Sequence, residues 1–174
     1  QIESSINRVI KSKNYILGRE VSSLEKEFSR FINVKYTIGV ANGTDAIELS
    51  LRCLGIGKND EVISVSHTAT ASISAICATN AKAVLVDVEP EFYNINVDEV
   101  QKAINSKTKA ILVVHLYGHP AKINELKLLC KKNNLFLIED CSQAHGSMVG
   151  NKRVGSIGDI ACFSCYPTKN LGGI

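Results

Sequence analysis

Apolar residues along this chain fall into two alternating patterns. In some segments they recur every three or four residues, which is the spacing of one face of an amphipathic helix. Between these segments lie short, nearly continuous apolar runs, such as residues 110–116 and 135–139, which favour buried strands. Together the two patterns predict helices over residues 2–13, 21–31, 42–54, 70–78, 97–104 and 123–132, and strands over residues 36–41, 61–65, 83–88, 110–116, 135–139 and 159–164.

Strands that are apolar on both faces have to be covered on both faces. Their alternation with helices predicts an α/β fold, in which a mostly parallel open sheet is flanked by helices. Local signals support the helix boundaries. Residues 22–25 (Ser-Ser-Leu-Glu) fit a capping box at the start of the second helix, Asn96 is expected to cap the fifth, and Gly55 is expected to end the third.

The composition excludes several classes of protein. Of 174 residues, 45% are hydrophobic and 21% are charged, so the chain is neither disordered nor collagen-like, and it has the length of one ordinary domain. The net charge of +3 is spread along the chain, so we expect no nucleic-acid or membrane partner. The longest uncharged run, residues 62–81, is interrupted by polar residues and does not predict a membrane span.

The cysteines bear on cellular location. The six cysteines lack the dense, regular spacing of a disulfide-rich secreted protein, and no signal-peptide pattern opens the chain, so we expect a reduced, cytoplasmic protein. Cys162 and Cys165 form a C-x-x-C pattern. A redox pair normally opens a helix and a zinc site needs a second pair, so we interpret both as core thiols and expect no metal site.

Ligands of open α/β sheets bind beyond the carboxyl ends of the strands. Residues able to react or to hold a ligand follow four of the predicted strands, at residues 42–45, 66–68, 140–146 and 164–170. In the first group, Gly43, Thr44 and Asp45 begin a predicted helix, where free backbone N–H groups and the helix dipole suit a phosphate. The alternative is an ordinary N-cap, in which Thr44 or Asp45 satisfies its own helix.

Asp140 and Lys169 are the candidate reactive groups at the later strand ends. The Asp140 carboxylate can hold a protonated ring nitrogen or a metal, or it can cap the next turn. Lys169 follows an apolar strand in an irregular segment, where it can form an imine with a carbonyl compound or can be an ordinary surface lysine. Histidines also follow the strands, but without the spacing of a metal site: His67, His115, His119 and His145.

Taken together, these groups match the requirements of one cofactor, pyridoxal 5′-phosphate (PLP). The helix N-terminus at Gly43 would take the phosphate, Asp140 would keep the pyridine nitrogen protonated, and Lys169 would form the covalent link. The constellation therefore predicts a PLP enzyme.

Several longer motifs resemble, in order and over nearly the whole chain, the DegT/StrS-type nucleotide-sugar aminotransferases, which are PLP enzymes of the aspartate aminotransferase fold. The motifs are residues 42–46 (Asn-Gly-Thr-Asp-Ala), 87–90 (Asp-Val-Glu-Pro), 115–120 (His-Leu-Tyr-Gly-His-Pro), 139–146 (Glu-Asp-Cys-Ser-Gln-Ala-His-Gly) and 163–172 (Phe-Ser-Cys-Tyr-Pro-Thr-Lys-Asn-Leu-Gly).

The resemblance implies a role for each candidate residue. Lys169 and Asp140 would be the catalytic residues, and Gln143 would lie beside the cofactor ring. The phosphate would be bound at the helix N-terminus and by the residue after the last strand: Gly43, Thr44, Asp45 and Ser164. Many members of the family have an aromatic residue at the position of Ala69 that stacks on the cofactor ring, so here this contact is absent or comes from another residue, such as His67.

The resemblance also implies the reaction and the partners. The amino donor would be glutamate, the acceptor a ketosugar linked to a nucleotide diphosphate, and the enzyme a homodimer. Because the family usually continues with a smaller C-terminal domain, we expect residues 1–174 to be an incomplete large cofactor-binding domain. Two alternatives stay open: a sugar dehydratase of the same family, against which Lys169 argues, and a non-catalytic regulatory homologue.

Overall fold

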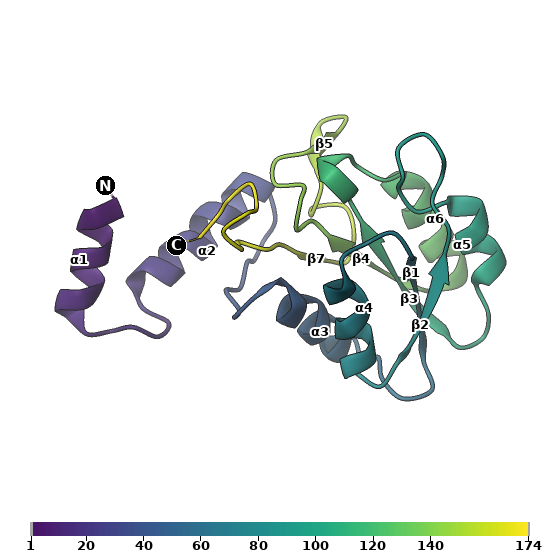
Figure 1. Ribbon diagram of the computed structural model, residues 1–174, viewed down its shortest axis with the longest axis horizontal. Helices are drawn as coiled ribbons and strands as arrows, with labels where there is room; N and C mark the ends of the chain where they lie inside the picture. The colour runs from purple at the N-terminus through teal and green to yellow at the C-terminus, as the bar shows by residue number, and fades with distance from the viewer. Residues whose placement is uncertain (1, 174) are drawn as a thin grey trace. The chain divides into compact units, whose positions relative to one another are not determined.

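The computed structural model describes residues 2–173 and has most of the predicted helices and strands (Figure 1). The helices are α1 (Ile2–Ser12), α2 (Arg19–Ile32), α3 (Gly43–Cys53), α4 (Thr70–Ala78), α5 (Val97–Ala103), α6 (Ile123–Asn133) and the short 3-10 helix η1 (Leu116–Gly118). The strands are β1 (Glu61–Val65), β2 (Lys82–Val86), β3 (Thr108–Val114), β4 (Phe136–Asp140), β5 (Met148–Val149), β6 (Lys152–Arg153) and β7 (Ile160–Cys162).

The chain divides into two compact units, one ending at Gly39 and the other beginning at Val40. The first unit contains α1 and α2. The second contains a five-stranded parallel sheet in the order β2-β1-β3-β4-β7 and the remaining helices. This arrangement confirms the predicted α/β class with a mostly parallel open sheet.

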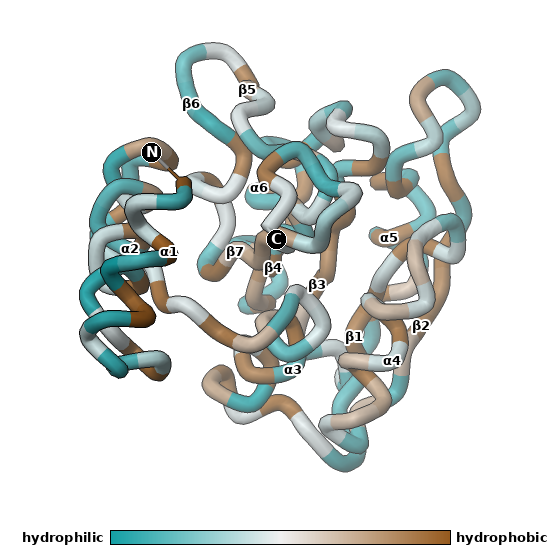
Figure 2. The backbone as a smooth tube through the Cα atoms, turned by 60° about the vertical axis from the view of Figure 1, so that its left-hand side comes forward, coloured by the Kyte–Doolittle hydropathy of each residue, from teal (hydrophilic) through white to brown (hydrophobic). Residues whose placement is uncertain are grey.

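Side chains of the sheet alternate between two buried faces. On β3, Ile111 and Val113 belong to the core that α5 and α6 cover, whereas Ala110 and Leu112 belong to the core that α3 and α4 cover. The hydrophobic brown of Figure 2 runs along β3 and β4 for this reason. Burial of both faces explains why these strands appear in the sequence as continuous apolar runs.

The strand predicted over residues 36–41 is wrong. These residues form no strand in the structure, and no described residue pairs with them in a ladder. Instead, the N–H of Gly39 donates a hydrogen bond to a carboxylate oxygen of Glu25 at 2.8 Å. The apolar run is therefore a loop segment that Glu25 of α2 holds through a hydrogen bond. The apolar pattern of the sequence does not distinguish such a segment from a strand.

The capping box predicted at residues 22–25 is also wrong. Helix α2 begins earlier, with Gly18 as its N-cap and without a side-chain cap. Ser22 lies inside the helix, since its N–H donates to the carbonyl oxygen of Gly18 at 3.2 Å. Asn96 does cap α5 as predicted, accepting hydrogen bonds from the N–H groups of Asp98 and Glu99.

The stretch between β4 and β7 contains a small hairpin that the sequence patterns do not predict. Strands β5 and β6 pair in antiparallel fashion, and Gly150 between them has a positive φ of 59°. None of the helices over residues 2–173 combines the length and apolarity needed to span a membrane.

Candidate functional site

The N-terminus of α3 presents two available backbone donors. Asn42 caps this helix, because its Oδ1 accepts a hydrogen bond from the N–H of Asp45 at 2.9 Å. The cap is therefore neither Thr44 nor Asp45, and it occupies the Asp45 donor. Among the described residues, the N–H groups of Gly43 and Thr44 have no acceptor, as is usual in the first turn of a helix.

Gly43 packs tightly against two serines from distant parts of the sequence. A Cβ atom at Gly43 would lie 2.9 Å from the Cβ of Ser164 and 3.5 Å from the Oγ of Ser142, so no larger residue fits without displacing its neighbours. We call Gly43, Ser142 and Ser164 the Gly43 cradle. The structure thus brings together Gly43 and Ser164, two of the predicted site residues, at the start of α3.

Asp140 lies at the end of β4 and is 5% exposed. Its Oδ1 accepts a hydrogen bond from the N–H of Ser142 at 3.1 Å, and its Oδ2 accepts one from the Oγ of Ser72 at 2.8 Å. Donors on both oxygens fix the orientation of the carboxylate. Because Ser142 also belongs to the Gly43 cradle, it connects Asp140 to the helix N-terminus.

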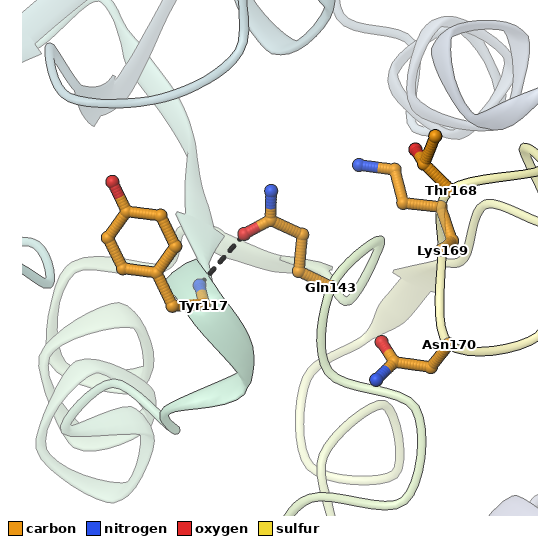
Figure 3. A pocket seen from close by; sticks show the side chains of 5 residues that line it. All are labelled: Tyr117, Gln143, Thr168, Lys169 and Asn170. Carbon is orange, nitrogen blue, oxygen red and sulfur yellow. Dashed lines mark hydrogen bonds between the residues drawn. The ribbon is translucent and has the colours of Figure 1, made fainter.

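Lys169 and Gln143 line a pocket of about 430 Å³ together with Tyr117, Thr168 and Asn170. In Figure 3 the Lys169 side chain extends from the C-terminal segment towards Gln143. The Oε1 of Gln143 accepts a hydrogen bond from the N–H of Tyr117 at 2.8 Å, which leaves the Gln143 NH₂ group directed away from that bond (Figure 3). The residues that line the pocket do not include Asp140 or the members of the Gly43 cradle. The two features are adjacent in the sequence, because Ser142 belongs to the cradle and Gln143 lines the pocket.

A tight turn holds Lys169 in place. Its N–H donates to the carbonyl oxygen of Tyr166 at 2.8 Å, and the N–H of Gly173 donates to the carbonyl oxygen of Cys165 at 2.8 Å. His145 lies near this turn. Burial lowers the pKa of His145 below its ordinary value; a hydrogen bond with Asn170 opposes this effect, and the positive charge of Lys169 adds to it.

Three aromatic residues gather beside the pocket. The ring of His67 lies 6.2 Å from the ring of Tyr93 and 6.2 Å from that of Tyr117, and its Nε2 is 3.4 Å from the Tyr117 hydroxyl. Both tyrosines have positive φ angles, 60° and 54°, which non-glycine residues seldom adopt. Ala69 is the N-cap of α4, with no side chain beyond Cβ to offer a ligand.

Glu139 and His115 form a buried pair that the sequence patterns do not predict. Both side chains are 0% exposed, and His115 Nε2 lies 3.1 Å from Glu139 Oε2. His115 Nδ1 accepts the N–H of Ala121 at 3.0 Å, so the proton of the neutral ring is on Nε2 and is donated to Glu139. Glu139 also accepts the N–H groups of three residues before β7: Gly155, Ile157 and Gly158.

The cysteine prediction is only half correct. Cys162 is buried, but Cys165 is exposed, and both are free thiols. Within residues 2–173, the side chains of His115, Glu139 and Cys141 are the one group of three with metal-ligand types close together. The nitrogen atoms of His115 and the carboxylate oxygens of Glu139 have the hydrogen-bond partners described above.

Comparison with known proteins agrees with this geometry. The family model described as the DegT/DnrJ/EryC1/StrS aminotransferase family matches residues 1–173. The dTDP-3-amino-3,6-dideoxy-α-D-galactopyranose transaminase of Aneurinibacillus thermoaerophilus is 50% identical over 164 residues, which are 94% of this chain and 45% of that protein.

Experimental structures give the same result. DesV of S. venezuelae, crystallised in complex with a ketimine intermediate, superposes with a TM-score of 0.97 at 42% identity and covers 99% of this chain and 46% of its own. NtdA of Bacillus subtilis with bound cofactor PMP has a TM-score of 0.93 at 30% identity, covering 99% and 39%. The chain therefore spans less than half the length of each of these three proteins. It belongs to the DegT/DnrJ/EryC1/StrS aminotransferase family.

Proposed function

We propose that the full-length protein containing this chain is a PLP-dependent aminotransferase. It transfers an amino group from glutamate to a ketosugar linked to a nucleotide diphosphate. Residues 1–174 form an incomplete part of its large cofactor-binding domain and do not include the small C-terminal domain. The enzyme works as a homodimer in the cytoplasm. The named relative and the two structures support this reaction class, and the residues of the chain support the cofactor.

The Gly43 cradle fits the phosphate of PLP. The free N–H groups of Gly43 and Thr44, at the positive end of α3, would bind phosphate oxygens, and the Ser164 hydroxyl would add a donor. The absence of a side chain at Gly43 lets Ser164 approach the start of α3 closely. Asp45 would contribute its own N–H only by giving up the hydrogen bond to Asn42 Oδ1.

The other predicted residues fit the ring and the reacting end of the cofactor. Asp140 would accept a hydrogen bond from the pyridine N–H and so keep that nitrogen protonated. Gln143 would lie beside the ring, because it lines the same pocket as Lys169. Lys169 would hold PLP covalently through Nζ, and the same amine, once released, would move a proton to and from the substrate carbon.

PLP itself would supply a conjugated ring that accepts electrons from the substrate carbon. The observation that carries the assignment is the position of Lys169. Its side chain lines a pocket with Gln143, and the adjacent Ser142 both donates a hydrogen bond to Asp140 and belongs to the Gly43 cradle. A lysine, a carboxylate and an anion cradle are thus linked through one short segment, as PLP requires.

Two weaker features support the remaining parts of the proposal. The six cysteines are all free thiols, which agrees with a reducing cytoplasm. Apolar side chains along one side of α1 are exposed, namely Ile2, Ile6 and Ile10, which is the kind of surface that a second copy of the chain would cover in a homodimer.

Borohydride trapping tests the assignment of Lys169. The full-length protein is incubated with PLP, reduced and digested, and the peptides are analysed by mass spectrometry. We expect the reduced cofactor on Lys169, no label in Lys169→Ala, and unchanged labelling in Lys152→Ala, whose lysine is exposed on β6. Label on another residue, or on none, contradicts the proposal. Incubation with glutamate and a panel of nucleotide-linked ketosugars then identifies the acceptor.

A further inference from the structure

Asp140 has a buried partner on a different element, and the family motifs quoted above do not include it. Ser72, in the first turn of α4, is 1% exposed, and its Oγ lies 2.8 Å from Asp140 Oδ2. A serine within a helix ordinarily faces solvent or bonds to the carbonyl four residues earlier. Here the hydroxyl crosses from the helix to the end of β4, so α4 contributes directly to the surroundings of Asp140.

The direction of this hydrogen bond follows from the groups involved. A carboxylate only accepts, so the single proton of the Ser72 hydroxyl points to Asp140 Oδ2. The Oγ1 of Thr68 lies 3.2 Å from Ser72 Oγ, and because the Ser72 proton is already used, Thr68 must be the donor in that contact. The hydrogen bonds therefore run from Thr68 to Ser72 to Asp140, in the order in which each strengthens the next.

The rest of Asp140 is already immobile. Its strand lies between two parallel neighbours, and its carbonyl oxygen accepts the N–H of His115 at 3.1 Å. Rotation of the carboxylate is the remaining freedom of this side chain. Ser142 restrains Oδ1 and Ser72 restrains Oδ2. Without Ser72, one oxygen of a nearly buried carboxylate would lose its donor, which is costly in a nonpolar environment.

We propose that Ser72, oriented by Thr68, is a positioning residue that holds the Asp140 carboxylate for the pyridine nitrogen of PLP. This inference rests on the proposed function. Ser72 does not contact the cofactor in this scheme. The Ser72 hydroxyl fixes the plane of the Asp140 carboxylate and stabilises the negative charge of that group. The remaining lone pairs of Asp140 are therefore directed towards the position of the pyridine nitrogen before the cofactor binds.

The affinity of the protein for PLP tests the role of Ser72 and can be measured without following the catalytic reaction. PLP binding to the full-length apoprotein is followed by absorbance for Ser72→Ala and for Ser74→Ala, a matched change at an exposed position of the same helix. We expect Ser72→Ala to weaken PLP binding by roughly tenfold, the usual scale for one hydrogen bond to a charged group. Ser74→Ala should bind as the wild type does. Equal affinities for wild type and Ser72→Ala would overturn the inference.

A double-mutant cycle separates positioning from a general structural effect. If Ser72 acts through Asp140, Ser72→Ala causes no further loss of PLP affinity when Asp140→Ala is already present. If it only packs α4 against the sheet, the same loss appears in both backgrounds, and the inference fails. Ser72→Thr, which keeps the hydroxyl, should retain most of the affinity.

A variant with a smaller effect controls for a folding defect in Ser72→Ala. Borohydride labelling of Lys169 then shows whether the proposed function or the role of Ser72 has failed. Thr68→Val removes the outer hydroxyl with little change in shape, and we expect about a threefold loss of affinity, less than for Ser72→Ala. Unchanged binding by Thr68→Val contradicts its part in the arrangement. If borohydride does not label Lys169 in the wild type, the proposed function fails; if it does while Ser72→Ala binds PLP normally, only the present inference fails.

Discussion

Glu139 and Asp140 are adjacent in the sequence but have different surroundings, because successive side chains of a strand point to opposite faces of the sheet. Asp140 faces Ser72 and Ser142, and Glu139 faces His115 and the loop before β7. Burial raises the pKa of Glu139, but hydrogen bonds from His115, Gly155 and Gly158 outweigh it and leave the pKa below its ordinary value of 4.5. The carboxylate is therefore a charged anchor for the loop that leads to Lys169.

Glu139→Gln tests this anchor. An amide nitrogen in place of one carboxylate oxygen would face N–H donors, so we expect the free energy of unfolding of the full-length protein to fall by roughly 2–3 kcal/mol. Urea denaturation measures it, and Glu125→Gln on the exposed side of α6 is the control.

The lowered pKa of Glu139 also predicts how stability depends on pH. The contribution of this group is present above pH 4.5, where the unfolded chain is also ionised, and is lost as the pH falls from 4.5 through the folded pKa. The wild type should therefore lose stability below pH 4.5 more steeply than Glu139→Gln. Parallel pH profiles would show that the hydrogen bonds to Glu139 do not stabilise its charge.

At the scale of the elements, α3 and the segment after β7 pack so closely at Gly43 and Ser164 that no side chain fits between them. Gly43→Ala places a Cβ 2.9 Å from that of Ser164, so the two segments have to separate. Overpacking of this kind costs about 1–3 kcal/mol. We expect at least a tenfold loss of PLP affinity in the full-length protein, because the donors of α3 and Ser164 no longer meet, with a smaller loss of thermal stability.

Gly57→Ala is the matched control for that change. An added Cβ there would be 3.4 Å from the nearest heavy atom, the carbonyl oxygen of Thr79, which is close to an ordinary contact. PLP titration of the apoprotein compares the two variants. If Gly43→Ala binds PLP as tightly as Gly57→Ala, the Gly43 cradle is not the phosphate site.

The elements also show what sequence patterns can predict. The limits of β1 and α4 are as predicted, because helical and strand periodicities change sharply at residues 61–70. Residues 36–41 have the same apolar character, but their hydrogen bond goes to Glu25, and no pattern within the segment reports a partner that distant. Helix α2 begins before its Ser-rich turn because a backbone bond to Gly18 extends it by a turn.

At the scale of the whole molecule, sequence patterns predict some of the site residues and miss others, as they do for the helices and strands. Asp140 ends β4 and Lys169 follows β7, so the topology of a parallel sheet is enough to suggest them. Gly43 follows the predicted strand that the structure lacks, and the signal that identifies it is the start of a helix at residues 42–45. Ser72 lies within a helix, and its contact with Asp140 depends on how α4 packs on the sheet. Tyr117 enters the pocket through a backbone with positive φ, which nothing in its neighbourhood predicts.

The packing of the whole second unit can be tested through its thiols. Cys53, Cys77 and Cys165 are exposed, whereas the other three cysteines, Cys130, Cys141 and Cys162, are buried. Burial raises the pKa of Cys130 and of Cys162 from 9.0 to about 12. At neutral pH this shift leaves about a thousandfold less of the reactive thiolate, in addition to the steric protection.

Alkylation with N-ethylmaleimide therefore should divide the six cysteines into two classes of three. The full-length native protein is labelled for increasing times at pH 7, and peptide mapping by mass spectrometry reads each cysteine separately. The buried thiols should react only as fast as the protein opens, while all six react rapidly in urea, which is the control. Rapid labelling of Cys162 in the native protein would mean that α3 does not cover the sheet at β7, and the Gly43 cradle beside it could not exist as described.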